Sequence, residues 1–287
     1  MVNAQEWLDK NYPNELVKRE VKELAASLYT IDDQGNQYEK VFKEELENSL
    51  IINNLINLKK LYLCSNKLTK LVIINCSEIE LISCSGNFLA DVNFLFEIDS
   101  KKLTALYLEN NNISEQNLSC FEEFTNLTAL LVGNSDKNKI KKGIYNRFTG
   151  SLEFLKDLTR LERLSIKNTD IDSGLEYLPS TIKEFHCLAD QRAESGVKRI
   201  EEELKFFLIS SFHGTYNFKG WREKIKGEAS NSSEQEKAPH THKNSHKRKA
   251  KRQISQKEVK YQKTYLVKGK EKEQQWFQQI EINPYKK

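Results

Sequence analysis

LKKLYLCSNKL, residues 58–68, is the stretch of sequence that decides the fold. Its leucines and Asn66 follow the spacing L-x-x-L-x-L-x-x-N-x-L without a substitution. The same register returns in IELISCSGNFL (79–89) and in LTALYLENNNI (103–113), each with an Asn at the position of Asn66. Three weaker copies follow, with another polar residue at the Asn position: Ser135 in LTALLVGNSDK (127–137), Thr169 in LERLSIKNTDI (161–171) and Asp190 in IKEFHCLAD (182–190).

This spacing is typical of leucine-rich repeats. Side chains alternate along a strand, so residues 60–64 point Leu61 and Leu63 inward and Tyr62 outward. The Asn side chain can bond backbone groups that a turn would otherwise bury unpaired. One repeat cannot bury its own apolar face, so the repeats must stack and their strands form a parallel sheet. The sequence therefore predicts the α/β class: a solenoid of about six repeats with a concave parallel sheet, and a partial copy before them in LENSLIINNLINL (46–58).

Both ends of such a stack need caps, because each exposes a raw apolar edge. Residues 1–45 are predicted as an N-terminal helical cap in which Pro13 separates two short helices. The solenoid follows over residues 46–192. The amphipathic VKRIEEELKFFLISSF predicts a C-terminal helical cap over residues 193–227. Core packing is expected for the tryptophans of the two caps, Trp7 and Trp221.

One step between successive copies is longer than the others and contains NKIKKGIYNRFTGSLEFLKDL. We predict an insertion over residues 137–151, followed by a helical turn with Leu152, Leu155 and Leu158 on one side. The insertion is either a tolerated loop or a contact surface. The first alternative is the commoner one, but three large side chains make the insertion a candidate contact surface: Tyr145, Arg147 and Phe148.

Charge divides the chain into a body and a tail. Residues 1–236 carry 30 basic and 37 acidic side chains, whereas residues 237–272 carry 13 basic and two acidic ones. Residues 228–262 have too few apolar side chains to offset the entropy of ordering, so we expect disorder there. The whole segment 228–287 is predicted as a disordered basic tail with a short hydrophobic end.

Composition also bears on location. There is no run of eighteen apolar residues, so no membrane span is expected. The first ten residues do not resemble a secretory signal, and the five cysteines form no C-x-x-C pair. These features favour a reducing compartment, the cytoplasm, with the nucleus as the alternative.

The sequence offers no recognisable catalytic or metal-binding motif. A phosphate-binding loop, a G-x-S-x-G elbow and the kinase signature residues are all missing. Cys64 and His186 belong to repeats too far apart to form a nucleophile and base pair. The histidines of the basic tail at 240, 242 and 246 lack preorganisation and sit among cations, so we expect no metal there. We therefore predict a protein without catalytic activity, cofactor or metal; the rival class is an enzyme or an enzyme fragment.

The outward positions of the strands form the most informative surface. Solenoid concavities usually bind partners, and aromatic and Arg side chains are enriched in binding hot spots. An exposed stripe of such residues is expected on the concave face. We therefore predict a non-catalytic scaffold that binds a partner protein there, the alternative being a stripe without a ligand. The predicted partner-binding residues are Tyr62, Tyr107, Leu131, Arg163 and His186.

The tail suggests a second class of function. HKRKAKR (246–252) concentrates five basic residues, which suits importin recognition or contact with nucleic-acid phosphates. A solvated, inert tail is the third option. The alternative function is therefore a nuclear or nucleic-acid-associated adaptor that acts through Lys247, Arg248, Lys249, Lys251 and Arg252.

Two segments resemble a known family. NAQEWLDKNYPNELV (3–17) and GIYNRFTGSLEFLKDLTRLERLSIKNTDIDSGLEYLP (143–179) are similar to an expanded family of leucine-rich-repeat proteins from mycorrhizal fungi. The resemblance covers about residues 3–225. It implies a cytosolic or nuclear solenoid, in some members fused to a kinase or a coiled coil. The sequence after Gly227 departs from that pattern and matches no such fused domain.

Overall fold

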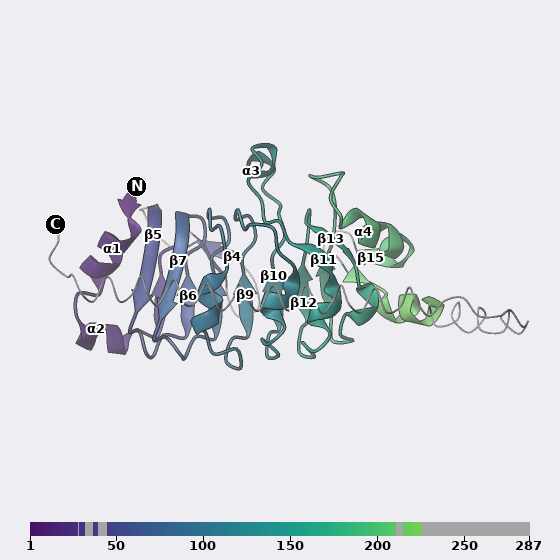
Figure 1. The fold of residues 1–287 in the computed structure, drawn as a ribbon. Coiled ribbons are helices and arrows are strands. Elements are labelled where there is room, and N and C mark those ends of the chain that lie inside the picture. The colour runs from purple at the N-terminus through teal and green to yellow at the C-terminus, as the bar shows by residue number, and fades with distance from the viewer. Residues whose placement is uncertain (28, 32–36, 40–44, 211–214, 226–287) are drawn as a thin grey trace, which may run out of the picture. The chain divides into compact units, whose positions relative to one another are not determined.

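The computed structural model describes residues 1–27, 29–31, 37–39, 45–210 and 215–225 (Figure 1). All of them belong to one unit, Met1–Gly227. The predicted disorder of residues 228–262 and the rest of the tail lie outside the described residues. Within the described part, no helix has the length and apolar character needed to cross a membrane.

A parallel sheet of seven strands is the main element of the fold. Its strands are three residues long and pair in register, one from each repeat, so that each inward leucine or its equivalent lies level with the next. In spatial order the strands are β14 (Glu184–His186), β12 (Arg163–Ser165), β10 (Ala129–Leu131), β9 (Ala105–Tyr107), β8 (Leu81–Ser83), β6 (Lys60–Tyr62) and β2 (Glu23–Ala25). The predicted α/β class with parallel strands is confirmed.

The opposite side of the stack is more varied. A second parallel sheet joins β1 (Val2–Asn3), β5 (Leu46–Asn53) and β7 (Lys67–Ile74). Further along the chain this side is built from β11 (Thr149–Ser151), β13 (Asp170–Ser173) and four 3₁₀ helices, η1 (Asn93–Glu97), η2 (Leu118–Phe121), η3 (Leu152–Leu155) and η4 (Leu175–Tyr177). The predicted helical turn after the insertion is η3, and Leu152 and Leu155 are buried.

One continuous core lies between the two sides. It contains the inward strand residues together with the apolar residues of the 3₁₀ helices. Leu61, Ile82 and Leu106 are all fully buried in it. Stacked repeats thus bury together the apolar face that none of them could bury alone.

An additional repeat precedes the first of the six copies, and it begins earlier than the partial copy predicted at residues 46–58. β2 pairs with β6, and Leu24 lies level with Leu61. Asn66 donates to the carbonyl of Ala26 and accepts from the backbone N–H of Leu46. Residues 23–26 and Leu46 therefore belong to one repeat. β5, in the predicted partial copy, is not in the seven-stranded sheet but lies across the core from it.

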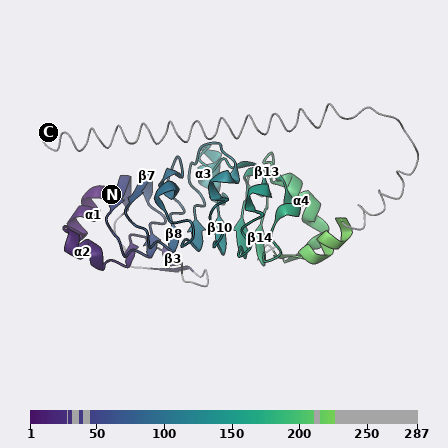
Figure 2. The ribbon, with the colours of Figure 1, turned by 60° about the horizontal axis from the view of Figure 1, so that its bottom comes forward.

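The two ends carry the expected helices. Asn3 and Asn14 cap α1 (Ala4–Asn11) and α2 (Glu15–Glu20), where their side-chain oxygens accept from free N–H groups of the first turn. At the other end α4 (Lys198–Leu204), η5 (Lys205–Phe207) and helical residues 218–225 close the stack (Figure 2). β15 (Leu208–Ser210) and β16 (Thr215–Tyr216) form a short antiparallel pair there. Both cap tryptophans, Trp7 and Trp221, are buried as predicted.

Candidate functional site

A ladder of asparagine side chains runs along the stack just beyond the strands. Asn87 shows the pattern: its Nδ2 donates to the carbonyls of Leu63 at 2.7 Å and Cys84 at 3.0 Å. Its Oδ1 accepts from the N–H of Leu68 at 3.0 Å. One amide thus satisfies three buried backbone groups of two successive repeats, which explains why the turn requires Asn.

The fourth repeat fills its ladder position from an unexpected place. Asn146 donates to the carbonyls of Leu108 at 2.8 Å and Val132 at 3.0 Å, and accepts from the N–H of Ile113 at 3.3 Å. These three bonds are equivalent to those of Asn87, two repeats further along the stack. Ser135 is exposed, so the prediction that it takes the Asn position is wrong.

Residues 133–145 connect the strand of this repeat to Asn146, and we call this segment the excursion. It begins and ends earlier than the predicted insertion 137–151, because Asn146 and the buried Phe148 already occupy repeat positions. Phe148 stands where the other repeats have their last Leu or Ile. The length of the step between repeats shows that residues have been inserted. It does not show at which residue the repeat pattern resumes.

The last two ladder positions are weaker. Thr169 donates one bond, from Oγ1 to the carbonyl of Ile166 at 2.7 Å, as its shorter side chain allows. Asp190 does not continue the ladder. Its carboxylate accepts from the Nδ2 of Asn168 at 3.0 Å and from the side chain of Gln191. The ladder therefore ends at Thr169 in the described part of the chain.

The start of the excursion is fastened to the ladder edge. It carries α3 (Lys137–Lys141), which stands above the body of the repeats in Figure 1. Asn110 accepts with Oδ1 from the N–H groups of Ser135 at 2.6 Å and Asp136 at 2.8 Å. Asp136 in turn caps the N-terminus of α3. The base of the excursion is thus held by hydrogen bonds and does not hang as an open loop.

Lys139 ties α3 to two earlier repeats. Its Nζ donates to the carbonyl of Asn87 at 2.6 Å and to that of Asn110 at 2.9 Å. The ammonium also lies 4.2 Å from the ring centroid of Phe88, within the range of a cation–π contact. Burial lowers the pKa of Lys139 to about 8, although Asp136 acts in the opposite direction.

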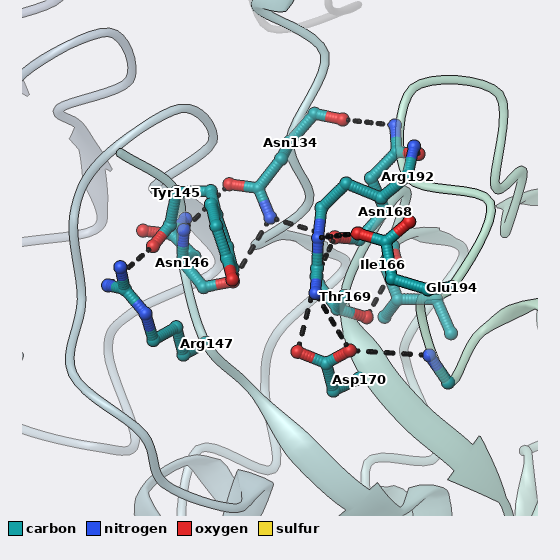
Figure 3. A network of polar contacts seen from close by, with 11 residues as sticks. Asn134, Tyr145, Asn146, Arg147, Ile166, Asn168, Thr169, Asp170, Arg192 and Glu194 are labelled. Carbon is teal, nitrogen blue, oxygen red and sulfur yellow. Dashed lines mark hydrogen bonds and ion pairs between the residues drawn. The ribbon is translucent and has the colours of Figure 1, made fainter. Parts of the chain in front are cut away.

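The end of the excursion is clamped between two arginines (Figure 3). The ring of Tyr145 lies 4.5 Å from the guanidinium of Arg147 and 4.1 Å from that of Arg192. Arg192 is buried and pairs with Asp170 at 3.1 Å. Arg147 donates to the carbonyl of Gly143 at 2.6 Å. The large side chains proposed as a contact surface are therefore half-buried in this clamp, or, for Phe148, in the core.

The outward face of the seven-stranded sheet is closed in its N-terminal half. Tyr62 and Tyr107 are only 3% and 2% exposed, so the prediction of an exposed tyrosine stripe is wrong. They form a second apolar cluster with Leu81, Ala105 and Ala129. Between β2 and β5 the chain forms an antiparallel pair, β3 (Tyr29–Ile31) and β4 (Gln37–Glu39). Alternation gives the direction of a side chain but not what lies beyond it.

The face around β9, β10 and β12 is built differently. Arg163 Nη2 donates to Tyr107 Oη at 2.9 Å, a bond that crosses β10 above Ala129. Ser165 Oγ donates to Glu109 Oε1 at 2.7 Å and crosses the same chain above Gly133. A Cβ at Gly133 would come within 2.9 Å of Ser165 Oγ and 2.6 Å of Lys167 N. Small residues at both outward positions thus make room for both bridges.

Leu131 lies between the two bridges and is half-buried. Burial raises the pKa of Glu109, while the hydrogen bond from Ser165 acts against that rise. We call Leu131 and its bridges the Leu131 patch: Tyr107, Glu109, Leu131, Arg163 and Ser165. Half-buried Glu184 and His186 on β14 adjoin it, as does half-buried Lys167, which follows β12.

The structure therefore brings together three of the five predicted binding residues, Tyr107, Leu131 and Arg163. His186 lies on the next strand, level with Ser165. Tyr62 lies three strands from Leu131 and belongs to the closed half of the face. Sequence reasoning missed the role of Ala129 and Gly133, and small residues at the outward positions on both sides of Leu131 were the available signal.

The buried thiols and the histidines form no reactive arrangement in the part of the chain described. Cys64 Sγ lies 2.8 Å from Ser83 Oγ, and burial raises the pKa of Cys64. Burial likewise raises the pKa of Cys187, which contacts Tyr216, to about 12. No group of three potential ligands that could hold a metal ion occurs among the described residues. The histidines at 240, 242 and 246 lie outside them.

Similarity to known proteins is found among solved structures. No protein-family model and no curated protein matches the sequence. Among solved structures, the chain is similar to a chain in the crystal structure of the Arabidopsis receptor kinase HAESA in complex with the peptide hormone IDA and the co-receptor SERK1. The identity is 16%, the TM-score is 0.34, and the match covers 61% of this chain and 35% of that one. This chain thus spans about a third of the length of the chain it matches.

Proposed function

We propose that this protein is a non-catalytic interaction module of the leucine-rich-repeat type, and that it binds a partner protein through the Leu131 patch. One observation carries the proposal. The two bridges that cross β10 hold the polar groups of Arg163 and Glu109 in fixed positions on either side of an apolar side chain.

Such an arrangement suits recognition. A central apolar anchor flanked by oriented polar groups provides both burial and specificity at an interface. Side chains that are already ordered lose less conformational entropy on binding, so more of the contact energy appears as affinity. Neighbouring strands repeat at about 4.8 Å, which gives a partner a regular series of positions along the sheet.

Catalysis is the rival reading, and Ser165 is its best candidate nucleophile because His186 and Glu109 stand near it. The Ser165 side chain is only 1% exposed, however, and its hydroxyl donates to Glu109. A nucleophile must reach its substrate and lose its proton to a base. Ser165 instead holds Glu109 in place, which supports the binding role.

Peptide selection on the full chain tests the proposal. Peptides from a random library would be selected on wild-type protein and their affinities measured for Leu131→Arg and for Tyr177→Arg. Tyr177 is 43% exposed on η4, across the core from the sheet, and serves as the matched control. We expect Leu131→Arg to weaken binding at least about tenfold, since it places a charge in the anchor position, and Tyr177→Arg to leave it unchanged. Equal affinities for wild type and Leu131→Arg would overturn the proposal.

Other predictions stand on the sequence alone. Nuclear import or polyanion binding by residues 247–252 concerns a segment outside the described residues. Location in the cytoplasm or nucleus and the resemblance to the fungal family likewise remain predictions.

A further inference from the structure

The exposed side of the excursion is basic. Four of the six residues 137–142 are lysines, and none is acidic. Lys139 is turned back to the carbonyls of Asn87 and Asn110. The other three, Lys137, Lys141 and Lys142, are exposed. They stand on a body that carries 30 basic and 37 acidic residues over 1–236, so their charge is local and opposed to that of their surroundings.

The position of these lysines is fixed by the anchors at both ends of the excursion. Asn110 and Lys139 fasten the first part, and the Tyr145 clamp fastens the last. An extra loop that was only tolerated would need none of these contacts, because a long surface loop costs little free energy. Anchored lysines keep their positive charges at a constant place on the surface.

The excursion also borders the Leu131 patch. The chain leaves β10 at Leu131 and reaches α3 at Lys137. α3 then lies over the turns of the second and third repeats, as the bonds of Lys139 show. A partner seated on the patch and extending past the ends of the strands would meet the three exposed lysines.

We propose that Lys137, Lys141 and Lys142 bind an acidic segment of a partner protein. This inference rests on the proposed function, because it takes the same partner to be seated on the Leu131 patch. Lysine ammonium groups act as compact point charges, which suits carboxylates in an irregular or extended segment. Opposite charges at a rim mainly speed association and select the partner, and they lose effect as salt rises.

Nucleic acid fits the excursion less well. Binding of a single strand combines basic groups with aromatic rings on which bases stack. The aromatic ring of the excursion, Tyr145, already has arginines on it, at 4.5 Å and 4.1 Å. Three lysines on an acidic body also give few phosphate contacts, since affinity for nucleic acid grows with their number.

A labelled octaglutamate peptide is the probe for this inference. The full chain would be used, with Lys247, Arg248, Lys249, Lys251 and Arg252 changed to Gln in every sample so that the tail does not compete. In that background, Lys137→Gln, Lys141→Gln and Lys142→Gln are combined. The control combines the same change at three lysines that are also exposed but lie outside the excursion: Lys10, Lys156 and Lys219.

At low salt we expect the excursion triple variant to weaken octaglutamate binding about tenfold and the control triple variant less than about twofold. Equal losses in both would mean that only net charge matters, which overturns the inference. The inference would also be overturned if an oligonucleotide of equal charge, or vesicles containing anionic lipid, bound more tightly than octaglutamate and lost that binding in the excursion triple variant. The two proposals fail separately. If the selected peptides lose affinity in Leu131→Arg but not in the excursion triple variant, only this inference is contradicted. If octaglutamate binding depends on the three lysines while Leu131→Arg has no effect on the selected peptides, only the proposed function is contradicted.

Discussion

The third and fourth repeats reach the same chemistry by different routes. In the third, two residues separate the inward Leu108 from the ladder residue Asn111, which bonds to Leu108 O, Cys84 O and Leu89 N. In the fourth, the whole excursion 133–145 separates Val132 from Asn146, yet the three bonds are equivalent. The repeat is therefore defined by which backbone groups one amide must satisfy and not by a fixed length of chain.

Loss of the ladder amide is the largest effect we expect. Asn146→Ala leaves three buried backbone groups without partners, and Asn111→Ala does the same one repeat earlier. Each should lower the free energy of unfolding by about 3 kcal/mol, whereas Ser135→Ala should change it by less than about 0.5 kcal/mol. Urea denaturation of the three variants makes the comparison. A Ser135→Ala variant as unstable as Asn146→Ala would mean that Ser135 fills the Asn position, as the repeat spacing predicted.

The Tyr145 clamp should matter next. Arg192→Met removes a buried guanidinium that pairs with Asp170 at 3.1 Å, and we expect a loss of about 2 kcal/mol. Faster amide exchange of residues 137–145 should accompany it, because the excursion loses one of its anchors. The matched control is Arg199→Met, whose ion pair with Asp172 at 2.7 Å is exposed and should contribute less than about 0.5 kcal/mol. Unchanged exchange in Arg192→Met would show that the excursion is held from the ladder edge alone.

The smallest expected effect depends on pH. The pKa of Lys139 is about 8 in the folded chain against 10.5 for an ordinary lysine, because burial disfavours the charged form. Between these values the unfolded chain binds more protons, so the stability of wild type should rise with pH relative to Lys139→Met. We expect about 1 kcal/mol between pH 8 and pH 10, reduced by partial contact with water. A difference between the two proteins that stays constant over this range would mean that burial does not shift this amine.

Leucine spacing was enough to predict the parallel sheet, the inward residues and the turn chemistry of Asn66, Asn87 and Asn111. It could not predict Asn146, because a hydrogen bond depends on where a side chain arrives in space and not on its distance along the chain. The burial of Tyr62 and Tyr107 was missed for a similar reason. Their outward direction follows from alternation, but their burial depends on what packs on that face, which alternation does not give.

Part of the candidate site was within reach of the sequence. Leu131 and Arg163 were found because large side chains at outward positions have no core to fill. The two bridges that orient the patch depend on the small residues of the chain that they cross, and the sequence pattern did not predict these bridges. Gly133 is the informative residue, since any side chain there would meet Ser165 and Lys167.

The bonds of Asn146 make the fourth repeat a natural grafting point. Gly133 and Asn134 still belong to the stack, because Gly133 has no room for a side chain and Asn134 bonds to Asn146. The chain between Asn134 and Asn146 can change in length and sequence while the stack keeps its geometry, since closing a longer loop adds little cost. The repeat before the first copy offers the same opportunity, because Asn66 joins Ala26 to Leu46 across residues 27–45. Exchange of segments at these two points would let descendants of one scaffold acquire different surfaces without rebuilding the core.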